Sequence, residues 1–197
     1  LEEVANIMAV HGYEMMEIPA YSGCEQFDYE DILKPGKTAD LKKMLAGYGI
    51  TISALSNHAD SILILGPHNY STDKLFKGTP EEKIKYGTEC LLKTARAANA
   101  LEVPVVNGFT GVSDWGNYFP FPSADGWSKM EGWFVERFMP ILDKFKEYGV
   151  KFAVEPHPNN MIYDLHTAKR ALELLDYHPC FGYNLDPANI VYLGLKV

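Results

Sequence analysis

The runs KFAVEPHP (residues 151–158) and CFGYNLDPAN (residues 180–189) decide the fold of this chain. In each run a short apolar stretch ends in a carboxylate, Glu155 in the first and Asp186 in the second, and a proline follows at once. Such a stretch predicts a strand buried on both faces of a parallel sheet, and proline ends its regular pairing. The apolar spacing of residues 164–177 predicts a helix between the two strands. Because a strand–helix–strand unit places both C-terminal strand ends on one side of a sheet, we expect the two carboxylates to converge.

The rest of the chain repeats the order helix, short turn, strand. Strands are expected to begin near residues 13, 50, 103, 151 and 180. The segment Thr79-Pro80-Glu81-Glu82 is a capping box with proline at the first helical position, and Ser128 with Glu131 forms a second one. The connections 58–78 and 108–126 are too long for plain turns, which makes them candidate active-site loops. This alternation predicts a parallel sheet with helices outside it, either a (β/α)8 barrel or an open doubly wound sheet.

The ends of the expected strands favour the barrel. No glycine-rich phosphate-binding loop follows any strand, so the usual reason to prefer a nucleotide-binding open sheet is missing. A barrel places most of its strand ends in one functional ring, whereas an open sheet uses two or three. Here all five ends are polar: Glu17, Ser56 with His58, Asn107, Glu155 with His157, and Asp186 with Asn189. We therefore predict an α/β fold of the (β/α)8 TIM-barrel type.

Composition restricts the partners. The net charge is −8 and no run of lysine or arginine occurs, which argues against a nucleic-acid partner. No apolar stretch approaches ~20 residues and no signal peptide opens the chain, so neither a membrane span nor secretion is expected. The three cysteines are odd in number and far apart, as is typical of reduced thiols in a cytosolic protein. We expect a cytoplasmic protein that binds neither nucleic acid nor membrane.

Several segments together resemble a known family. The ending E-P-H-P, the helix sequence T-A-K-R-A-L, the run F-G-Y-N-L-D-P-A-N and the opening L-E-E-V-A-N-I-M-A-V-H-G-Y-E-M-M-E-I are similar to the xylose-isomerase-like (sugar phosphate isomerase/epimerase) TIM-barrel superfamily. The resemblance covers nearly the whole chain. It implies that residues 1–197 form a single, partial TIM-barrel domain with strands two to six present and the first and last strands missing.

The resemblance also implies a divalent metal with four protein ligands. Glu155 and Asp186 match the first two, and the remaining His and Glu are expected beyond Val197. Two positions depart from the family pattern. Asn189 stands where many members carry a histidine that contacts substrate, and Met161 stands where some carry a second glutamate. Asparagine can hydrogen-bond a sugar hydroxyl but cannot shuttle a proton near neutral pH.

These residue types suit enolisation chemistry. Removing a proton next to a carbonyl needs a Lewis acid on the oxygens and a base for the carbon-bound proton. Oxygen-rich sites with one imidazole suit Mn²⁺, Mg²⁺, Co²⁺ or Zn²⁺. We expect Glu155 and Asp186 to bind the metal, Glu155 and His157 to be catalytic, and the following residues to bind substrate: Glu17, His58, Asn107, Trp115 and Asn189. Simpler roles stay open for each, such as an ion pair for Glu17, a capped turn for Asp186 and ordinary packing for Trp115.

Three functions remain open on this basis. The first is a metal-dependent isomerase or epimerase of carbohydrate metabolism, acting on a small sugar or keto-sugar by proton abstraction alpha to a metal-bound carbonyl. The second is a lyase of the same fold, a dehydratase or an enzyme that cleaves an oxidised sugar derivative, with His157 as base. The third is a non-catalytic sugar-binding or partner subunit. An apurinic-site endonuclease of related fold is disfavoured by the acidity of the chain. A homo-oligomer is expected by family likeness.

Overall fold

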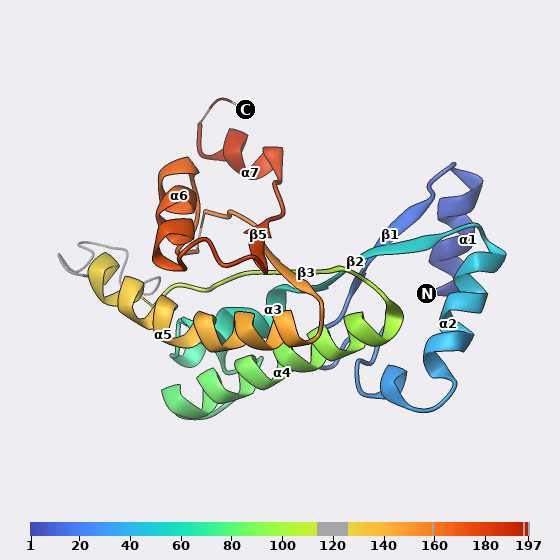
Figure 1. Cartoon of the computed structure of the whole chain (residues 1–197), viewed down its shortest axis with the longest axis horizontal. Helices are drawn as coiled ribbons and strands as arrows, with labels where there is room; N and C mark the ends of the chain where they lie inside the picture. The colour runs from blue at the N-terminus through green and yellow to red at the C-terminus, as the bar shows by residue number, and fades with distance from the viewer. Residues whose placement is uncertain (114–125, 159, 195, 197) are drawn as a thin grey trace.

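The computed structural model describes residues 1–113, 126–158, 160–194 and 196 (Figure 1). Its strands are β1 (Met15–Pro19), β2 (Thr51–Asn57), β3 (Val105–Gly108), β4 (Lys151–Val154) and β5 (Phe181–Tyr183). Its α-helices are α1 (Glu2–Val10), α2 (Lys37–Gly47), α3 (His58–Ser61), α4 (Pro80–Leu101), α5 (Gly126–Glu147), α6 (Leu165–Leu174) and α7 (Pro187–Tyr192). Three single-turn 3-10 helices are η1 (Asp31–Leu33), η2 (Ile62–Ile64) and η3 (Tyr70–Thr72).

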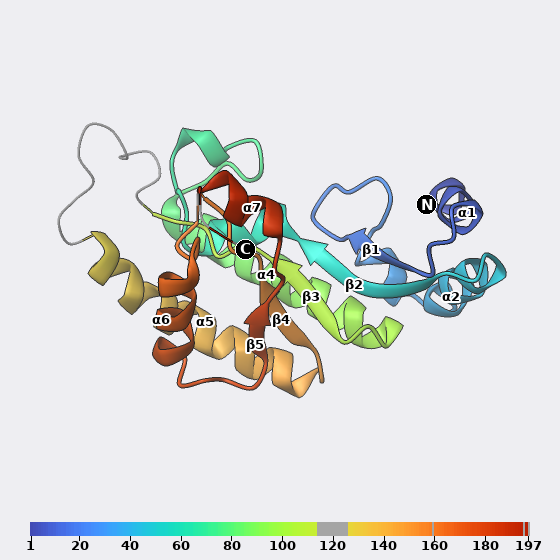
Figure 2. The ribbon, with the colours of Figure 1, turned by 90° about the horizontal axis from the view of Figure 1, so that it is seen from above.

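The five strands form one parallel sheet in the order β1-β2-β3-β4-β5. A doubly wound sheet reverses its strand order at a switch point, whereas neighbours in chain order form a continuous arc of a barrel. Helices α4 and α5 run along one face of this sheet (Figure 1), and the view from above shows the strands lying over them (Figure 2). The predicted α/β architecture with a parallel sheet and external helices is confirmed.

An aromatic layer joins α5 to the sheet. Phe138 and Phe145 of α5 pack on Phe152 of β4, with ring centroids 5.9 and 5.6 Å apart, and all three side chains are fully buried. Burying one such side chain contributes about 1.5–3 kcal/mol. This contact fixes the helix-facing side of β4 and therefore the place where Glu155 leaves the strand.

The opposite face of the sheet lines a hollow of about 410 Å³. Every strand contributes to it, with Glu17, Ser53, Val105, Ala153 and Gly182 as one example from each. Side chains alternate between the two faces of a strand, so Glu17 reaches this hollow while its neighbours Met16 and Ile18 are buried in the core.

Helix starts show where sequence signals succeed and fail. Thr79 caps α4 as predicted, accepting the Glu82 N–H at 3.3 Å while its own N–H donates to Glu82 Oε2 at 2.8 Å. The predicted cap at Ser128 is wrong, because α5 already begins at Gly126 and Ser128 lies inside it. In the described part of the chain no helix is both long and apolar enough to cross a membrane.

The connection after β2 is more ordered than a loop. It contains α3, η2 and η3, and a buried ammonium fastens it to α4. Lys83 of α4 is 1% exposed and donates to Asn69 O at 2.7 Å, Thr72 Oγ1 at 2.9 Å and Asp73 Oδ1 at 2.7 Å. Three acceptors satisfy the three donors of an ammonium, which is how a charge becomes tolerable in an interior.

Candidate active site

Glu155 lies at the centre of a group of polar side chains at the C-terminal end of the sheet. Its N–H donates to Gly108 O of β3 at 3.1 Å, which extends the strand pairing by one residue before Pro156 ends it. Its side chain is 15% exposed. Asn189 Nδ2 of α7 donates to Glu155 Oε1 at 2.8 Å, and His58 Nε2 lies 3.2 Å from Glu155 Oε2. Three predicted site residues from three separate segments thus meet at one carboxylate.

Local structure explains how His58 and Asn189 reach this point. Asn57 ends β2, and its side-chain oxygen accepts the Asp60 N–H at 3.0 Å, which starts α3 at His58. Asp186 caps α7 by accepting the Ala188 N–H at 2.8 Å, and Pro187 occupies the first helical position. Helix α3 begins directly after β2, and α7 begins shortly after β5, so the first turns of both hold polar side chains over the edge of the sheet.

His157 lies on the other side of an aromatic ring. Phe109 follows β3, and its ring centroid is 4.5 Å from that of His58 and 5.0 Å from that of His157. Two imidazole nitrogens, His58 Nε2 and His157 Nδ1, are buried and have no hydrogen-bond partner among the described residues. Unpartnered buried polar atoms are rare in folded proteins and are typical of sites that receive a ligand or a reacting group.

Asp186 follows β5, the strand paired with β4. The pairing continues past both strands, because Asn184 N–H donates to Val154 O at 3.0 Å. One carboxylate oxygen of Asp186 accepts the Ala188 N–H, so the capping role foreseen as the simpler alternative is present. A carboxylate has further lone pairs, and capping with one oxygen leaves the second for another partner.

Glu17 and Asn107 contact each other. The Asn107 amide, 5% exposed, donates to the Glu17 carboxylate, which is the partner of Glu17 in place of the lysine foreseen as an alternative. Both residues line the 410 Å³ hollow, whose lining includes neither Glu155 nor the two histidines around Phe109. The structure therefore places this pair on the inner face of the sheet and does not join it to the Glu155 group. Trp115 lies outside the described residues.

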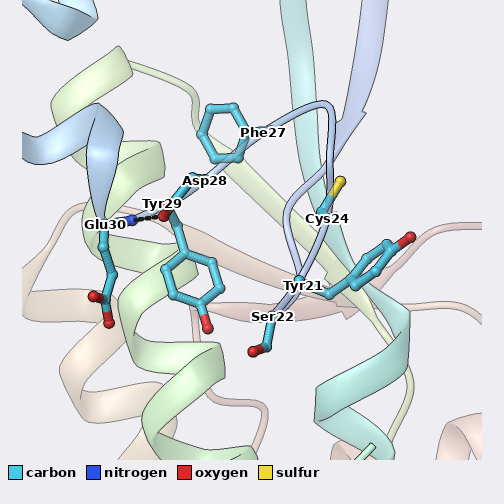
Figure 3. Close-up of a pocket in the computed structure, with 8 residues that line it drawn as sticks. Tyr21, Ser22, Cys24, Phe27, Asp28, Tyr29 and Glu30 are labelled. Atoms are coloured by element: carbon cyan, nitrogen blue, oxygen red, sulfur yellow. Dashed lines mark hydrogen bonds between the residues drawn. The ribbon is translucent and has the colours of Figure 1, made fainter.

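A second hollow of about 280 Å³ lies within the segment that follows β1 (Figure 3). Its lining contains none of the predicted site residues. Its polar groups are engaged in the fold: Asp28 Oδ1 accepts the Glu30 N–H at 2.7 Å, and the Tyr29 hydroxyl donates to Cys90 Sγ at 3.4 Å. Burial raises the pKa of Tyr29, which keeps this hydroxyl protonated. The Glu155 group is the stronger candidate.

Glu155, Asp186 and His58 are of residue types that bind divalent cations in proteins. Glu155 and Asp186 supply carboxylate oxygens from neighbouring strand ends, and His58 adds a buried imidazole nitrogen without a hydrogen bond. Oxygen donors with one nitrogen suit the metals named above. Among the described residues no three His, Cys, Asp or Glu side chains form a ready metal cluster. The described residues therefore do not form a metal site, and the binding of one ion by Glu155 and Asp186 stays a prediction.

The family follows from a sequence match over nearly the whole chain. The profile of the xylose isomerase-like TIM barrel proteins matches residues 6–195. The chain belongs to the xylose isomerase-like TIM barrel family. The resemblance read from the E-P-H-P and F-G-Y-N-L-D-P-A-N segments is thereby confirmed, and the five parallel strands match part of such a barrel. No curated protein matches this xylose isomerase-like chain in sequence.

Several solved structures share the fold. The probable 3-DHS dehydratase AsbF of Bacillus anthracis superposes with a TM-score of 0.66 at 18% identity, over 98% of this chain and 60% of its own. The IolI protein with a bound zinc atom gives 0.64 at 18% identity, over 98% and 60%. A D-psicose 3-epimerase solved with D-fructose gives 0.65 at 12% identity, over 97% and 59%. This xylose isomerase-like chain thus spans about 60% of the length of each.

Sequence reasoning missed two residues of this region, Phe109 and Asn160. Phe109 lies two residues beyond the strand-ending Asn107, in a segment where several aromatic residues drew attention to Trp115 instead. Asn160 is 8% exposed, and its Oδ1 accepts the Gly111 N–H at 2.8 Å. The polar segment after Glu155 was the available signal, since a polar side chain that follows a strand end can fasten one loop to the next.

Proposed function

We propose that this protein is a metal-dependent isomerase or epimerase of a small sugar or keto-sugar. The observation that carries the proposal is the Glu155 carboxylate, which directly follows β4 and meets His58 and Asn189 from two other segments. In TIM-barrel enzymes the catalytic residues lie at the C-terminal ends of several strands. A carboxylate surrounded by polar groups at this position suits proton transfer on a bound carbonyl compound.

The residues take the following roles. Glu155 and Asp186 would hold the divalent ion, which supplies Lewis acidity to the substrate oxygens. Asn189 orients Glu155 through the 2.8 Å hydrogen bond to Oε1. His157, with a buried Nδ1 that has no partner in the described part of the chain, accepts the proton from the carbon next to the carbonyl. In an isomerisation it returns this proton to the neighbouring carbon, whereas an epimerisation needs a second proton donor on the opposite face of the enolate. His58 binds substrate beside Glu155.

Proteins of the same fold support the chemistry. They include a D-psicose 3-epimerase and an L-ribulose 3-epimerase, and others were solved with zinc or magnesium. Their identities to this chain are 18% or lower, so the support concerns the reaction class and not a particular sugar.

The test is incorporation of solvent deuterium into keto-sugars. The protein is incubated in D₂O with a panel of ketopentoses and ketohexoses and each of Mn²⁺, Mg²⁺, Co²⁺ and Zn²⁺, and label at the carbons next to the carbonyl is followed by NMR. We expect label and a new isomer with the wild-type protein and neither with Glu155→Gln. Glu89→Gln, which changes an exposed carboxylate of α4, is the matched control and should retain activity. No label with any sugar or metal would contradict the proposal and favour a binding subunit.

A lyase of the same fold is the second candidate, and Asn189 favours it. The family often has a histidine at this position, and the asparagine here is hydrogen-bonded to Glu155 and cannot carry a proton. A dehydratase needs one base for the carbon-bound proton, and His157 can supply it. A probable dehydratase among the proteins of the same fold supports this alternative. In the deuterium experiment a lyase would consume a hydroxylated keto substrate without yielding an isomer.

A further inference from the structure

The two histidines near Glu155 are separated by one ring. Phe109 is half-buried and packs against His58 and His157 at interplanar angles of 56° and 54°. His58 Nε2 and His157 Nδ1 make no hydrogen bond within the described residues. His157 Nδ1 has no partner within the described residues, and His58 Nε2 has only the Glu155 carboxylate at 3.2 Å, so the packing against Phe109 helps to orient both imidazoles relative to Glu155.

The backbone holds Phe109 from both sides. Its N–H donates to Ser61 Oγ at 3.0 Å, and Ser61 is fully buried in α3. Gly108, just before it, has no space for a side chain, because a Cβ there would lie 3.0 Å from Asn57 O, from the Phe152 ring and from Ser61 Oγ. This close packing fixes the direction in which the chain leaves β3.

Beyond Phe109 the chain is clamped between two other segments. Leu65 N–H donates to Thr110 O at 3.3 Å, and Val112 N–H donates to Gly66 O at 3.0 Å, which joins the segment after β3 to the one after β2. On the opposite side Met161 N–H donates to Gly111 O at 3.0 Å. Three connections at the C-terminal end of the sheet thus form one hydrogen-bonded unit.

Asn160 is the side chain that closes this unit. Its buried Oδ1 accepts the Gly111 N–H at 2.8 Å, and its own N–H donates to His157 O at 3.0 Å. One residue therefore links the segment that carries Phe109 with the segment that carries His157. Without this amide oxygen the Gly111 N–H would be buried without a partner.

We propose that Asn160 and Phe109 are positioning residues: Asn160 fixes the segment after β3, and Phe109 then sets the orientation of His58 and His157 around Glu155. Neither residue needs to touch substrate. The catalytic meaning of this inference rests on the proposed function, but the geometric part does not. Misplacing a catalytic group by about 1 Å costs up to about a hundredfold in rate, so a small movement of residues 109–112 would matter.

The experiment is NMR of the histidine rings, because ring-proton shifts report the position of a neighbouring aromatic ring without any activity. Phe109→Leu removes the ring and supplies the reference shifts for His58 and His157. We expect Asn160→Ala to move both signals toward these reference values and Asn160→Asp, which keeps an acceptor for Gly111, to leave them near the wild-type values. Phe76→Leu is the matched control, since Phe76 stacks on Tyr86 at 4.3 Å in another part of the protein.

Wild-type histidine shifts in Asn160→Ala would overturn the inference. With a substrate in hand, Asn160→Ala should lower kcat/KM by about tenfold to a hundredfold, and Asn160→Asp should recover most of the loss. Equal loss in both Asn160 variants would also overturn it. If the wild-type protein turns over no substrate, the proposed function fails. The NMR result still decides whether Asn160 and Phe109 orient the two histidines.

Discussion

Gly111 tests the close contact between the segment after β3 and the segment after β2, and the size of the expected stability loss follows from the structure. Its φ is +79°, and a Cβ built at this position would lie 2.1 Å from Ile62 O and 2.5 Å from Gly66 O. Ordinary contact begins at 3.4 Å, so the Gly111→Ala side chain must separate from Ile62 O by about 1.3 Å more, the difference between 3.4 and 2.1 Å. The obstructing atoms are backbone, which cannot rotate away.

The expected cost has three parts. A left-handed conformation costs an L-residue about 1–2 kcal/mol. Relief of the overlap costs about 1–3 kcal/mol in a packed region. The shift also breaks the Val112–Gly66 hydrogen bond, which contributes about 0.5–1.5 kcal/mol. Gly111→Ala should therefore lower the free energy of unfolding by about 2.5–6.5 kcal/mol.

Gly149 provides the matched control. Its φ is +68°, and a Cβ there would meet nothing within 4 Å, so Gly149→Ala has the conformational cost alone, about 1–2 kcal/mol. Urea unfolding followed by far-UV circular dichroism gives the free energy of unfolding of both variants and the wild-type protein. A difference of about 2 kcal/mol or more between the variants is expected. Equal losses would refute the steric reasoning and with it the close approach of the two loops.

Two further predictions concern buried charges. Lys83→Met should lower the free energy of unfolding by about 3 kcal/mol, because Asn69 O, Thr72 Oγ1 and Asp73 lose their donor. Lys85→Met, on the exposed side of α4, should change it by less than about 0.5 kcal/mol in the same urea titration. Equal effects of the two lysine variants would contradict the buried ion pair. Burial raises the pKa of Asp60, so the folded protein retains the carboxyl proton better than the unfolded chain does. The contribution of protonated Asp60 to stability is therefore complete at low pH and is lost as the pH rises through the raised pKa. Asp60→Asn retains an acceptor for the Ser22 N–H, and its stability relative to the wild-type protein should increase as the pH is raised from about 4 to about 7; a difference independent of pH would exclude this assignment.

Much of the fold could be predicted because its signals are local. Apolar runs and glycine turns marked all five strands, and the Thr79 capping box marked the start of α4 correctly. The same residue spacing predicted a helix start at Ser128, but α5 begins two residues earlier, at Gly126. A capping box is a pattern of residue types and does not show whether the helix has already begun before it. The short helices after β2 were missed for a similar reason. Packing against α4 and the buried Lys83 ammonium stabilise them, and neither contact is visible in a sequence window.

The candidate site was predictable at its strand ends and not beyond them. Glu155, His58 and Asn189 meet because parallel strands place their ends together, which topology alone requires. Glu17 and Asn107 were expected at strand ends but lie within β1 and β3, where they line the 410 Å³ hollow and bind each other. Whether a polar residue of a strand reaches the Glu155 group or the 410 Å³ hollow depends on the strand register and on the path of each loop. Sequence patterns do not describe these features.

The claim on which the account depends is that Glu155 and Asp186 bind one divalent ion, and Mn²⁺ titration followed by electron paramagnetic resonance tests it most directly. We predict that the wild-type protein binds Mn²⁺ and that Glu155→Gln and Asp186→Asn each weaken binding by about tenfold or more. Asparagine caps helices as well as aspartate, so Asp186→Asn preserves α7. Asp164→Asn makes the same change at the cap of α6 and should bind like the wild-type protein. Wild-type affinity in both the Glu155 and the Asp186 variants would contradict the account.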